Sequence, residues 1–355
     1  MPNNINLSRK TMVFARVEQT YNTTVPIITT ATPTSDAMVL YDETNPTQID
    51  TKVVDRQVIR SSYSKNPNLK GRQLYSIQAK TMLMGSPGVF YNPATQTYDG
   101  HTGEIPTNAA SPVKASFLDV LFRCCGMQAT MATSTSLSIV YTPRSSGFES
   151  ATIWTFMDGI LHKAYGCVGN MTFNGKAGEG VDIACDIKGN LGATPVTFGG
   201  SNPVTTYPLD RKIMAESYAM TVNDASGMTL ANPIVRSFSF DPGCQIIERA
   251  DLNSAKGLYG LYIVDRQPKL NITVEVDNQS SWNPFAGLTS STTLAAVDFT
   301  HAASVTNYGE KWHFRFPQCQ TRDVKIADDQ GVRIYNISYD VVSSTDDGDW
   351  YICQY

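Results

Sequence analysis

Residues that could do chemistry occur in this 355-residue chain, but not at the spacings that chemistry requires. Neither a zinc-binding spacing nor an H-E-x-x-H motif joins the four histidines, which are His101, His162, His301 and His313. Cys124 and Cys125 are adjacent, so their side chains leave a helix in different directions, and no C-x-x-C pair occurs. We therefore expect no catalytic, cofactor or metal site, and a protein that is not an enzyme.

Three further polar clusters are better explained by turns than by binding sites. The glycines between Gly175 and Gly180 are not followed by the Lys-Ser/Thr pair of a phosphate-binding loop. The segment 145–147, Ser-Ser-Gly, lacks the frame of a nucleophile elbow. The acidic segments 328–329 and 346–349 lack the full pattern of a calcium loop, so we expect a polar turn and a solvated tail there.

The composition is typical of a large protein rich in β-strands. Hydrophobic residues make up 41% of the chain and charged residues 17%, with 17 Tyr and 14 Phe. The net charge of -4 argues against nucleic-acid binding through a basic patch. No apolar segment is long enough to cross a bilayer, and the N-terminus does not read as a secretory signal. We expect a protein made in the cytoplasm, with its seven cysteines reduced and mostly buried.

The elements that would have to position any functional residue are strands, and two of them stand out by their alternation. The segments 72–83 and 266–276 both alternate apolar and polar side chains, as a strand with one buried face does. The expected polar faces carry Ser76, Gln78 and Lys80 in the first segment, and Asn271, Thr273 and Glu275 in the second. Lys80 and Glu275 occupy matching places in the two segments.

These two segments belong to a series of matches that recur in the same order. The other matched pairs are 53–56 with 246–249, a helix at Val113–Cys125 with a shorter segment at 284–288, 152–156 with 311–316, Cys167 with Cys319, and 180–183 with 331–334. Such a series predicts a tandem duplication. We expect an N-terminal arm over 1–35, a first domain over 36–190, a linker over 191–230 and a second domain over 231–355. The apolar residues of the arm are expected to dock on a neighbouring subunit.

Each expected domain has too few strands to close a wide barrel alone, and its polar-faced strand needs lateral partners. Copies of one domain can supply these partners by pairing edge to edge around an axis. With two similar domains per chain, three chains would form a ring of six. The polar faces would then line a water-filled bore, and rings could stack into a tube.

Two stretches carry a resemblance to a known family. They are 54–73, from Val-Asp-Arg to Gly-Arg-Gln, and 141–163, which includes Gly-Phe-Glu-Ser and Asp-Gly-Ile-Leu-His-Lys. They resemble the major tail tube proteins of long-tailed, siphovirus-type bacteriophages, over most of the first domain and more loosely over the second. The segment 86–112, expected to be a long flap, departs from the family pattern. The resemblance implies two duplicated β-sandwich or half-barrel domains, with homotrimeric rings that contain a continuous inner β-barrel.

By the same resemblance the protein belongs to the virion tail, and DNA passes through its bore during ejection without specific binding. The implied partners are further copies of the chain and the tape measure, tail terminator and tail tip proteins. Loops of the 59–70 type would make ring-to-ring contacts. We expect a neutral-to-negative bore, because positive charge on the wall would hold DNA through counterion release. The variant Glu275→Lys is accordingly expected to slow ejection.

Two other classes of function are compatible with the sequence. The abundance of Ser, Thr, Asn and aromatic residues also suits a carbohydrate-binding or adhesive β-sandwich module of a virion. A hydrolase whose site carries no readable motif is the other alternative. Negative-stain microscopy separates the three, because only a tube protein should form rings or tubes.

Overall fold

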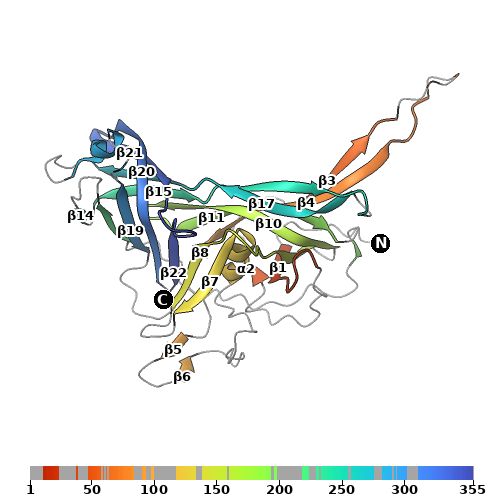
Figure 1. The fold of residues 1–355 in the computed structure, drawn as a ribbon, viewed down its shortest axis with the longest axis horizontal. Helices are drawn as coiled ribbons and strands as arrows, with labels where there is room; N and C mark the ends of the chain where they lie inside the picture. Colours follow the sequence, from red (N-terminus) through yellow and green to blue (C-terminus); the bar gives the residue numbers. More distant parts are fainter. Residues whose placement is uncertain are drawn as a thin grey trace, which may run out of the picture.

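The computed structural model describes residues 11–23, 37–38, 47–56, 59, 61, 64–83, 90–92, 97–99, 117–132, 138–157, 160–192, 196–197, 218–223, 229–231, 233–254, 257–275, 282–289, 292, 294–301 and 311–354. These residues are mainly β, and all strand pairings are antiparallel (Figure 1). The mainly-β class predicted from the sequence is therefore confirmed. For description we divide the chain into a first half, up to residue 197, and a second half, from residue 218.

The first half contains α2 (Phe117–Cys124), which is the α-helix of the described residues, and strands β1 (Thr11–Val17), β2 (Ala37–Met38), β3 (Thr47–Val54), β4 (Leu69–Met82), β5 (Phe90–Asn92), β6 (Thr97–Asp99), β7 (Met127–Ala132), β8 (Ser138–Pro143), β9 (Ala151–Met157), β10 (Ile160–Lys176), β11 (Val181–Leu191) and β12 (Val196–Thr197). The second half contains the 3-10 helix η1 (Pro284–Leu288) and strands β13 (Tyr218–Asn223), β14 (Thr229–Ala231), β15 (Val235–Asp241), β16 (Cys244–Ala250), β17 (Leu258–Arg266), β18 (Lys269–Glu275), β19 (Ala295–His301), β20 (Trp312–Asp329), β21 (Val332–Val341) and β22 (Tyr351–Gln354).

One path of paired strands, which we call the long sheet, passes through both halves along the longest axis of the molecule (Figure 1). Its order is β3-β4-β11-β10-β15-β18-β21-β20. The two halves meet where β10 pairs with β15, and there Gly175 lies opposite Phe238. A Cβ atom at Gly175 would come within 2.1 Å of the Phe238 ring, which explains the glycine.

A second layer is built from the long strands β10 and β20, which each leave the long sheet part-way along. The N-terminal part of β10 pairs with β9, and β9 with β1. The N-terminal part of β20 pairs with β19 and with β22, and β22 pairs with β8 of the first half. Apolar side chains from both halves fill the space between the layers as one continuous core, in which Phe173 stacks on Phe240 at 5.9 Å between ring centroids.

The two halves share one order of strand pairing. In the first half it is β3-β4-β11-β10-β9-β1-β2. In the second half it is β15-β18-β21-β20-β19-β13-β14. The register agrees as well, because Ile77 of β4 lies opposite Ile187, and Ile272 of β18 lies opposite Ile337. Each strand of one series thus has a counterpart in the other at the same place in the chain order.

This order corrects two of the matched pairs from the sequence. The match of 180–183 with 331–334 is shifted by one residue, because Ala184 and not Ile183 corresponds to Ile334. The segment 152–156 lies in β9, whereas 311–316 lies mostly in β20. By pairing order, β9 corresponds to β19, and β20 corresponds to β10. The match of Cys167 with Cys319 agrees with the structure, because Cys167 lies opposite Ala151 and Cys319 opposite Ala295 at equivalent bulges.

Element bounds also differ from the predictions in places. The two strands expected at 161–168 and 171–173 are one strand, β10, because its bulge near Gly166 bends the strand without ending it. Of the expected helix 113–125, the described part forms α2 over Phe117–Cys124. Gly126, with φ +79°, lies in the turn that follows it. The range 191–230 contains β12, β13 and β14, and β13 pairs with β19. The expected turn at 158–159 and most of the flap 86–112 lie outside the described residues.

The N-terminal arm finds its partner within the same chain. Strand β1 pairs with β9 along its whole length, and Val13 and Phe14 are at most 2% exposed. The side chain of Glu18, which follows the strand, accepts hydrogen bonds from Ser150 and Thr152. The prediction that these apolar residues dock was right, but they dock on the first half itself and not on a neighbouring subunit.

Candidate assembly surface

The two alternating segments of the sequence expose the faces that their pattern predicts. Side chains at alternate positions of β4 and β18 point away from the core, whereas their neighbours Ile77 and Ile272 are at most 1% exposed. The outward set is Ser76, Gln78 and Lys80 in β4, and Asn271, Thr273 and Glu275 in β18. We call the outward side of the long sheet the polar face.

The polar face continues across the strands between and beyond these two. Residues that lie opposite one another in an antiparallel sheet share a face, and Ser239, Asn271 and Ser338 lie opposite one another in this way. Asn170 donates to Asp241 at 2.8 Å and Ser239 donates to Asn174 at 2.8 Å, so hydrogen bonds join the halves across this face. Other members are Asp182, Asp186, Lys188, Thr172, Asn336 and Asp340.

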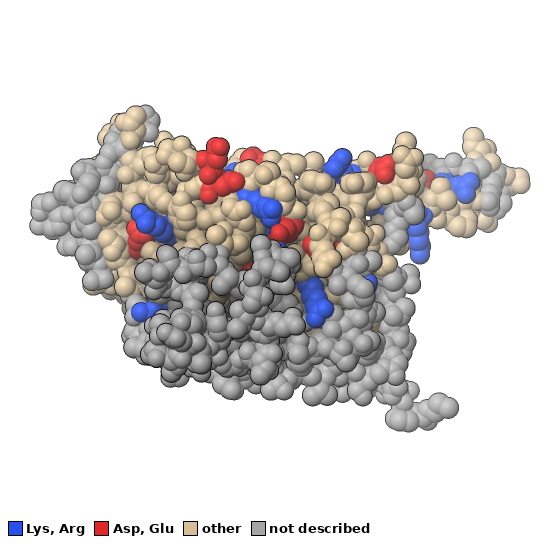
Figure 2. Space-filling model, turned by 60° about the horizontal axis from the view of Figure 1, so that its bottom comes forward, with Lys and Arg blue, Asp and Glu red and all other residues tan. Residues whose placement is uncertain are grey.

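Both signs of charge occur on the polar face. Its lysines include Lys80, Lys176, Lys188, Lys269 and Lys325, and its acidic residues include Asp182, Asp186, Asp241, Glu275, Asp323, Asp329 and Asp340. The face of the molecule drawn in Figure 2 likewise shows acidic and basic side chains interspersed among the described atoms. The described residues build no large field of one sign there, in keeping with the mild net charge of the sequence.

Glu275 is part of an ion-pair network. Arg236 of β15 donates to Glu275 at 2.8 Å through one nitrogen and at 3.1 Å through another, and it also contacts Asp329 at 3.1 Å. Lys80 lies opposite Ala184 and Glu275 opposite Ile334, so the two charges do occupy matching places in register. A Glu275→Lys change would place a second cation beside Arg236, and it therefore tests local stability together with the charge of the face.

The long sheet ends in two edges that pair with no other described strand. At one end, β3 pairs with β4 only. At the other end, β20 pairs with β21 from residue 319 onward, while its pairing with β19 stops at Cys319. Beside this edge Ile326 is 60% exposed, although it lies opposite the buried Tyr335. Unpaired backbone groups and exposed apolar side chains at a sheet edge favour the addition of another strand.

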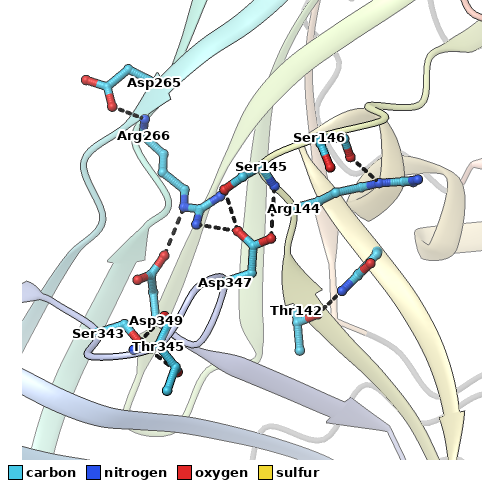
Figure 3. Close-up of polar contacts among 11 residues, drawn as sticks. Thr142, Arg144, Ser145, Ser146, Asp265, Arg266, Ser343, Thr345, Asp347 and Asp349 are labelled. Atoms are coloured by element: carbon cyan, nitrogen blue, oxygen red, sulfur yellow. Dashed lines mark hydrogen bonds and ion pairs between the residues drawn. The ribbon is translucent and has the colours of Figure 1, made fainter.

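The acidic segment 346–349 forms a structural contact with the first half, which corrects the expectation of a solvated tail. Arg266 donates to Asp347 at 2.8 Å and to Asp349 at 2.9 Å, as Figure 3 shows. Ser145 also donates to Asp347, through its hydroxyl at 2.5 Å. Partial burial alone would raise the pKa of Asp347, but hydrogen bonds from Ser145 and Arg266 lower it. The cluster borders an open cleft of about 460 Å³ and joins the two halves.

The other polar clusters of the sequence behave as turns. The glycines at 175–180 lie at the end of β10 and in the hairpin that leads to β11. Asp328 accepts a hydrogen bond from the backbone of Gly331 at 3.0 Å, in the hairpin between β20 and β21. Among the described residues, no group of three or more His, Cys, Asp or Glu side chains is placed to hold a metal ion.

Burial favours the neutral form of two of the described histidines and of six of the cysteines. Burial lowers the pKa of His301 to about 4 and also lowers the pKa of His162. All seven cysteines are free thiols, and burial raises the pKa of Cys244 to about 12 and of Cys353 to about 11. Such thiols carry little thiolate and are poor nucleophiles. His101 lies outside the described residues.

Comparison with protein-family models and with curated proteins gave no match for this chain. Within the described residues, no helix is long and apolar enough to span a membrane. The pairing of β8 with β22 and the contact of Arg266 with Asp347 and Asp349 were missed from the sequence. The alternation of Ile352 with polar neighbours signals a strand, but it gives no information on which strand pairs with it.

Proposed function

We propose that this chain is the structural subunit of a bacteriophage tail tube, in which copies assemble into stacked rings around a conduit for DNA. The observation that carries the proposal is the long sheet, whose polar face crosses both halves and which ends in an open edge on each side. A sheet of this kind can continue from one copy to the next. The residues at 54–73 and 141–163 that resemble tail tube proteins support the same conclusion.

The shared pairing order of the two halves supports a tandem duplication. Within the chain, β10 of the first half pairs with β15 of the second. The counterparts of these strands are β20 and β3, which are the two open edges. Pairing β20 of one copy with β3 of the next would repeat the internal junction between copies. Three chains would then close a ring of six similar units with an inner β-barrel.

The proposed role in ejection is mechanical and electrostatic. The polar face would line the bore, where its mixed charges and neutral polar groups allow DNA to pass without tight binding. The protein would act in the virion tail, with tape measure, tail terminator and tail tip proteins as neighbours. Neither enzymatic activity nor a cofactor is part of this role.

Negative-stain microscopy of the purified chain over a range of concentrations tests the proposal. Rings or tubes with a central hole are the expected result. A population of monomers at every concentration would contradict it and would favour the adhesive module or the hydrolase. Binding to a glycan array or hydrolysis of model esters and glycosides would then separate these two.

A further inference from the structure

Two hairpin arms extend from the long sheet at matching places. Strand β11 pairs with β4 only from Leu74 onward, and β21 pairs with β18 only from Lys269 onward. Beyond these points each hairpin continues without a third strand. The first arm comprises 50–56 and 64–73. The second arm is the hairpin β16–β17, which continues β15 and β18 after a break where Gln267 donates to the Gly243 carbonyl at 3.1 Å.

The second arm lies on the first half of its own chain. Leu258, Leu261 and Ile263 of this arm are at most 7% exposed and pack with Leu74 and Val168 of the long sheet. Leu74 lies two residues before Ser76 in β4, so its side chain is on the same face of the sheet. The arm therefore covers the outer end of the polar face.

Polar contacts fix the position of the second arm. Its Glu248 forms an ion pair with Arg72 of β4. Asn22 donates to the Tyr259 carbonyl at 2.5 Å, and the rings of Tyr21 and Tyr262 are 4.8 Å apart. The arm therefore reaches across β10, β11 and β4 in a defined orientation.

Beyond Arg72 at its base, which pairs with Glu248, the first arm has no such cover from the described residues. It projects away from the rest of the molecule in Figure 1, where it is drawn in orange. Val53 is 52% exposed, Val54 48% and Leu69 54%. A two-stranded hairpin is marginally stable in water without a third layer, and exposed apolar side chains on it indicate an interaction surface.

The two arms also match in sequence. Segment 53–56 reads Val-Val-Asp-Arg, and segment 246–249 reads Ile-Ile-Glu-Arg. The apolar pair, the acid and the arginine of the covered arm are thus repeated in the uncovered one. The surface that the second arm covers, across β10, β11 and β4, has its counterpart across β20, β21 and β18 of the second half.

We propose that the first arm docks on the polar face of the second half of another copy, across its β18, β21 and β20. The contact repeats between chains what the second arm does within one chain. The inference rests on the proposed self-assembly. It places the arm in a lateral contact between neighbours of one ring, whereas the resemblance implies ring-to-ring contacts for the 59–70 loop that the arm includes. In the ring, the placement of one copy that brings its β3 to the open edge of β20 in the next copy would also bring its first arm onto this surface.

Val53→Lys in the full chain tests the inference, with Val264→Lys as the matched control. Val264 is 53% exposed on the second arm, which is already docked within the chain. We expect Val53→Lys to leave the thermal midpoint of the dissociated monomer unchanged and to raise the concentration for half-assembly at least tenfold in sedimentation velocity. The control should assemble like the unaltered chain. Assembly of Val53→Lys at the unaltered concentration would overturn the inference.

Amine cross-linking of assemblies made from mixed isotope-labelled chains locates the arm. The expected mixed-isotope links join Lys52 or Lys70 to Lys269 of another copy. Links from these arm lysines to Lys163 or Lys188 of another copy, without links to Lys269, would overturn the arm contact but leave the tube proposal standing. An unaltered chain that stays monomeric would overturn both.

Discussion

At the scale of single residues, the buried acid Asp119 shows how packing sets the chemistry of a side chain. Asp119 lies in the first turn of α2 and is 3% exposed. Burial raises its pKa to about 6, although Arg123, 3.4 Å away, opposes the shift. Arg123 also donates to Glu149, so its positive charge only partly stabilises the ionised form of Asp119.

This raised pKa predicts a pH dependence of stability. The folded state holds the proton of Asp119 more tightly than the unfolded chain does. The stability gained from this protonation is therefore complete below about pH 4 and is lost as pH rises through about 6. Each pKa unit corresponds to about 1.4 kcal/mol. Urea unfolding between pH 4 and 7 should show that the variant Asp119→Asn lacks this loss. An equal slope in both proteins would contradict the prediction.

Gly175 makes a second prediction at this scale. Any larger side chain there would meet the ring of Phe238 at the junction of the halves. Gly175→Ala should therefore lower the free energy of unfolding by about 1–3 kcal/mol, as overpacking of a core does. Gly178, whose Cβ position is open and whose φ is +79°, gives the control Gly178→Asn, which should cost little. Denaturant midpoints of the two variants provide the comparison.

At the scale of elements, edges and alternation decide what the strands can do. From Tyr75 onward in β4, and throughout β18, buried and outward residues alternate. The outer part of β20 lacks this alternation, because both Lys325 and Ile326 are exposed. A strand whose apolar side is left partly open at an edge is a site for pairing with another chain. In the proposed ring, such an edge strand would be the functional unit.

The open edge of β20 gives a prediction for Ile326. A lysine in place of Ile326 should prevent edge-to-edge pairing, because a buried ammonium without a partner is costly. We expect the variant Ile326→Lys to fold with an unchanged circular dichroism spectrum but to remain monomeric in sedimentation velocity. Leu288→Lys, at an apolar residue of η1 that is 44% exposed, is the control and should still assemble. Normal assembly of Ile326→Lys would argue against pairing at this edge.

At the scale of the whole molecule, one core and one sheet unite the two halves. The pairings β10–β15 and β8–β22 join the halves in both layers, and Ser145 of the first half adds a polar contact to Asp347 of the second. The halves are thus held in one fixed relation by the chain itself. In the proposed ring, this relation would set the angle between successive units.

The charge of the polar face gives a prediction for assembled particles. Asp186 is an exposed acid on β11, opposite Gln78, and offers a cleaner probe than Glu275 because no strong ion pair holds it. Asp186→Lys should increase the retention of DNA in tubes at low salt, with a steeper dependence on salt concentration than in the unaltered protein. Asp186→Asn separates loss of the acid from gain of the cation. Equal retention in all three proteins would show that this face does not line the bore.

The sequence by itself predicted many of the strands and, for the segments 72–83 and 266–276, which side is polar, because alternation is a local property. It correctly placed Ser76, Gln78 and Lys80 outward, and it gave the turn at 175–180 and the end of α2 at Gly126. Only the tertiary structure decided which strands pair, for example Tyr141 of β8 with Ile352 of β22, more than 200 residues apart. It also decided that β10 is one bent strand and that one arm is covered and the other is not. Such choices depend on the shared packing of distant side chains around one core, and a local pattern does not encode that packing.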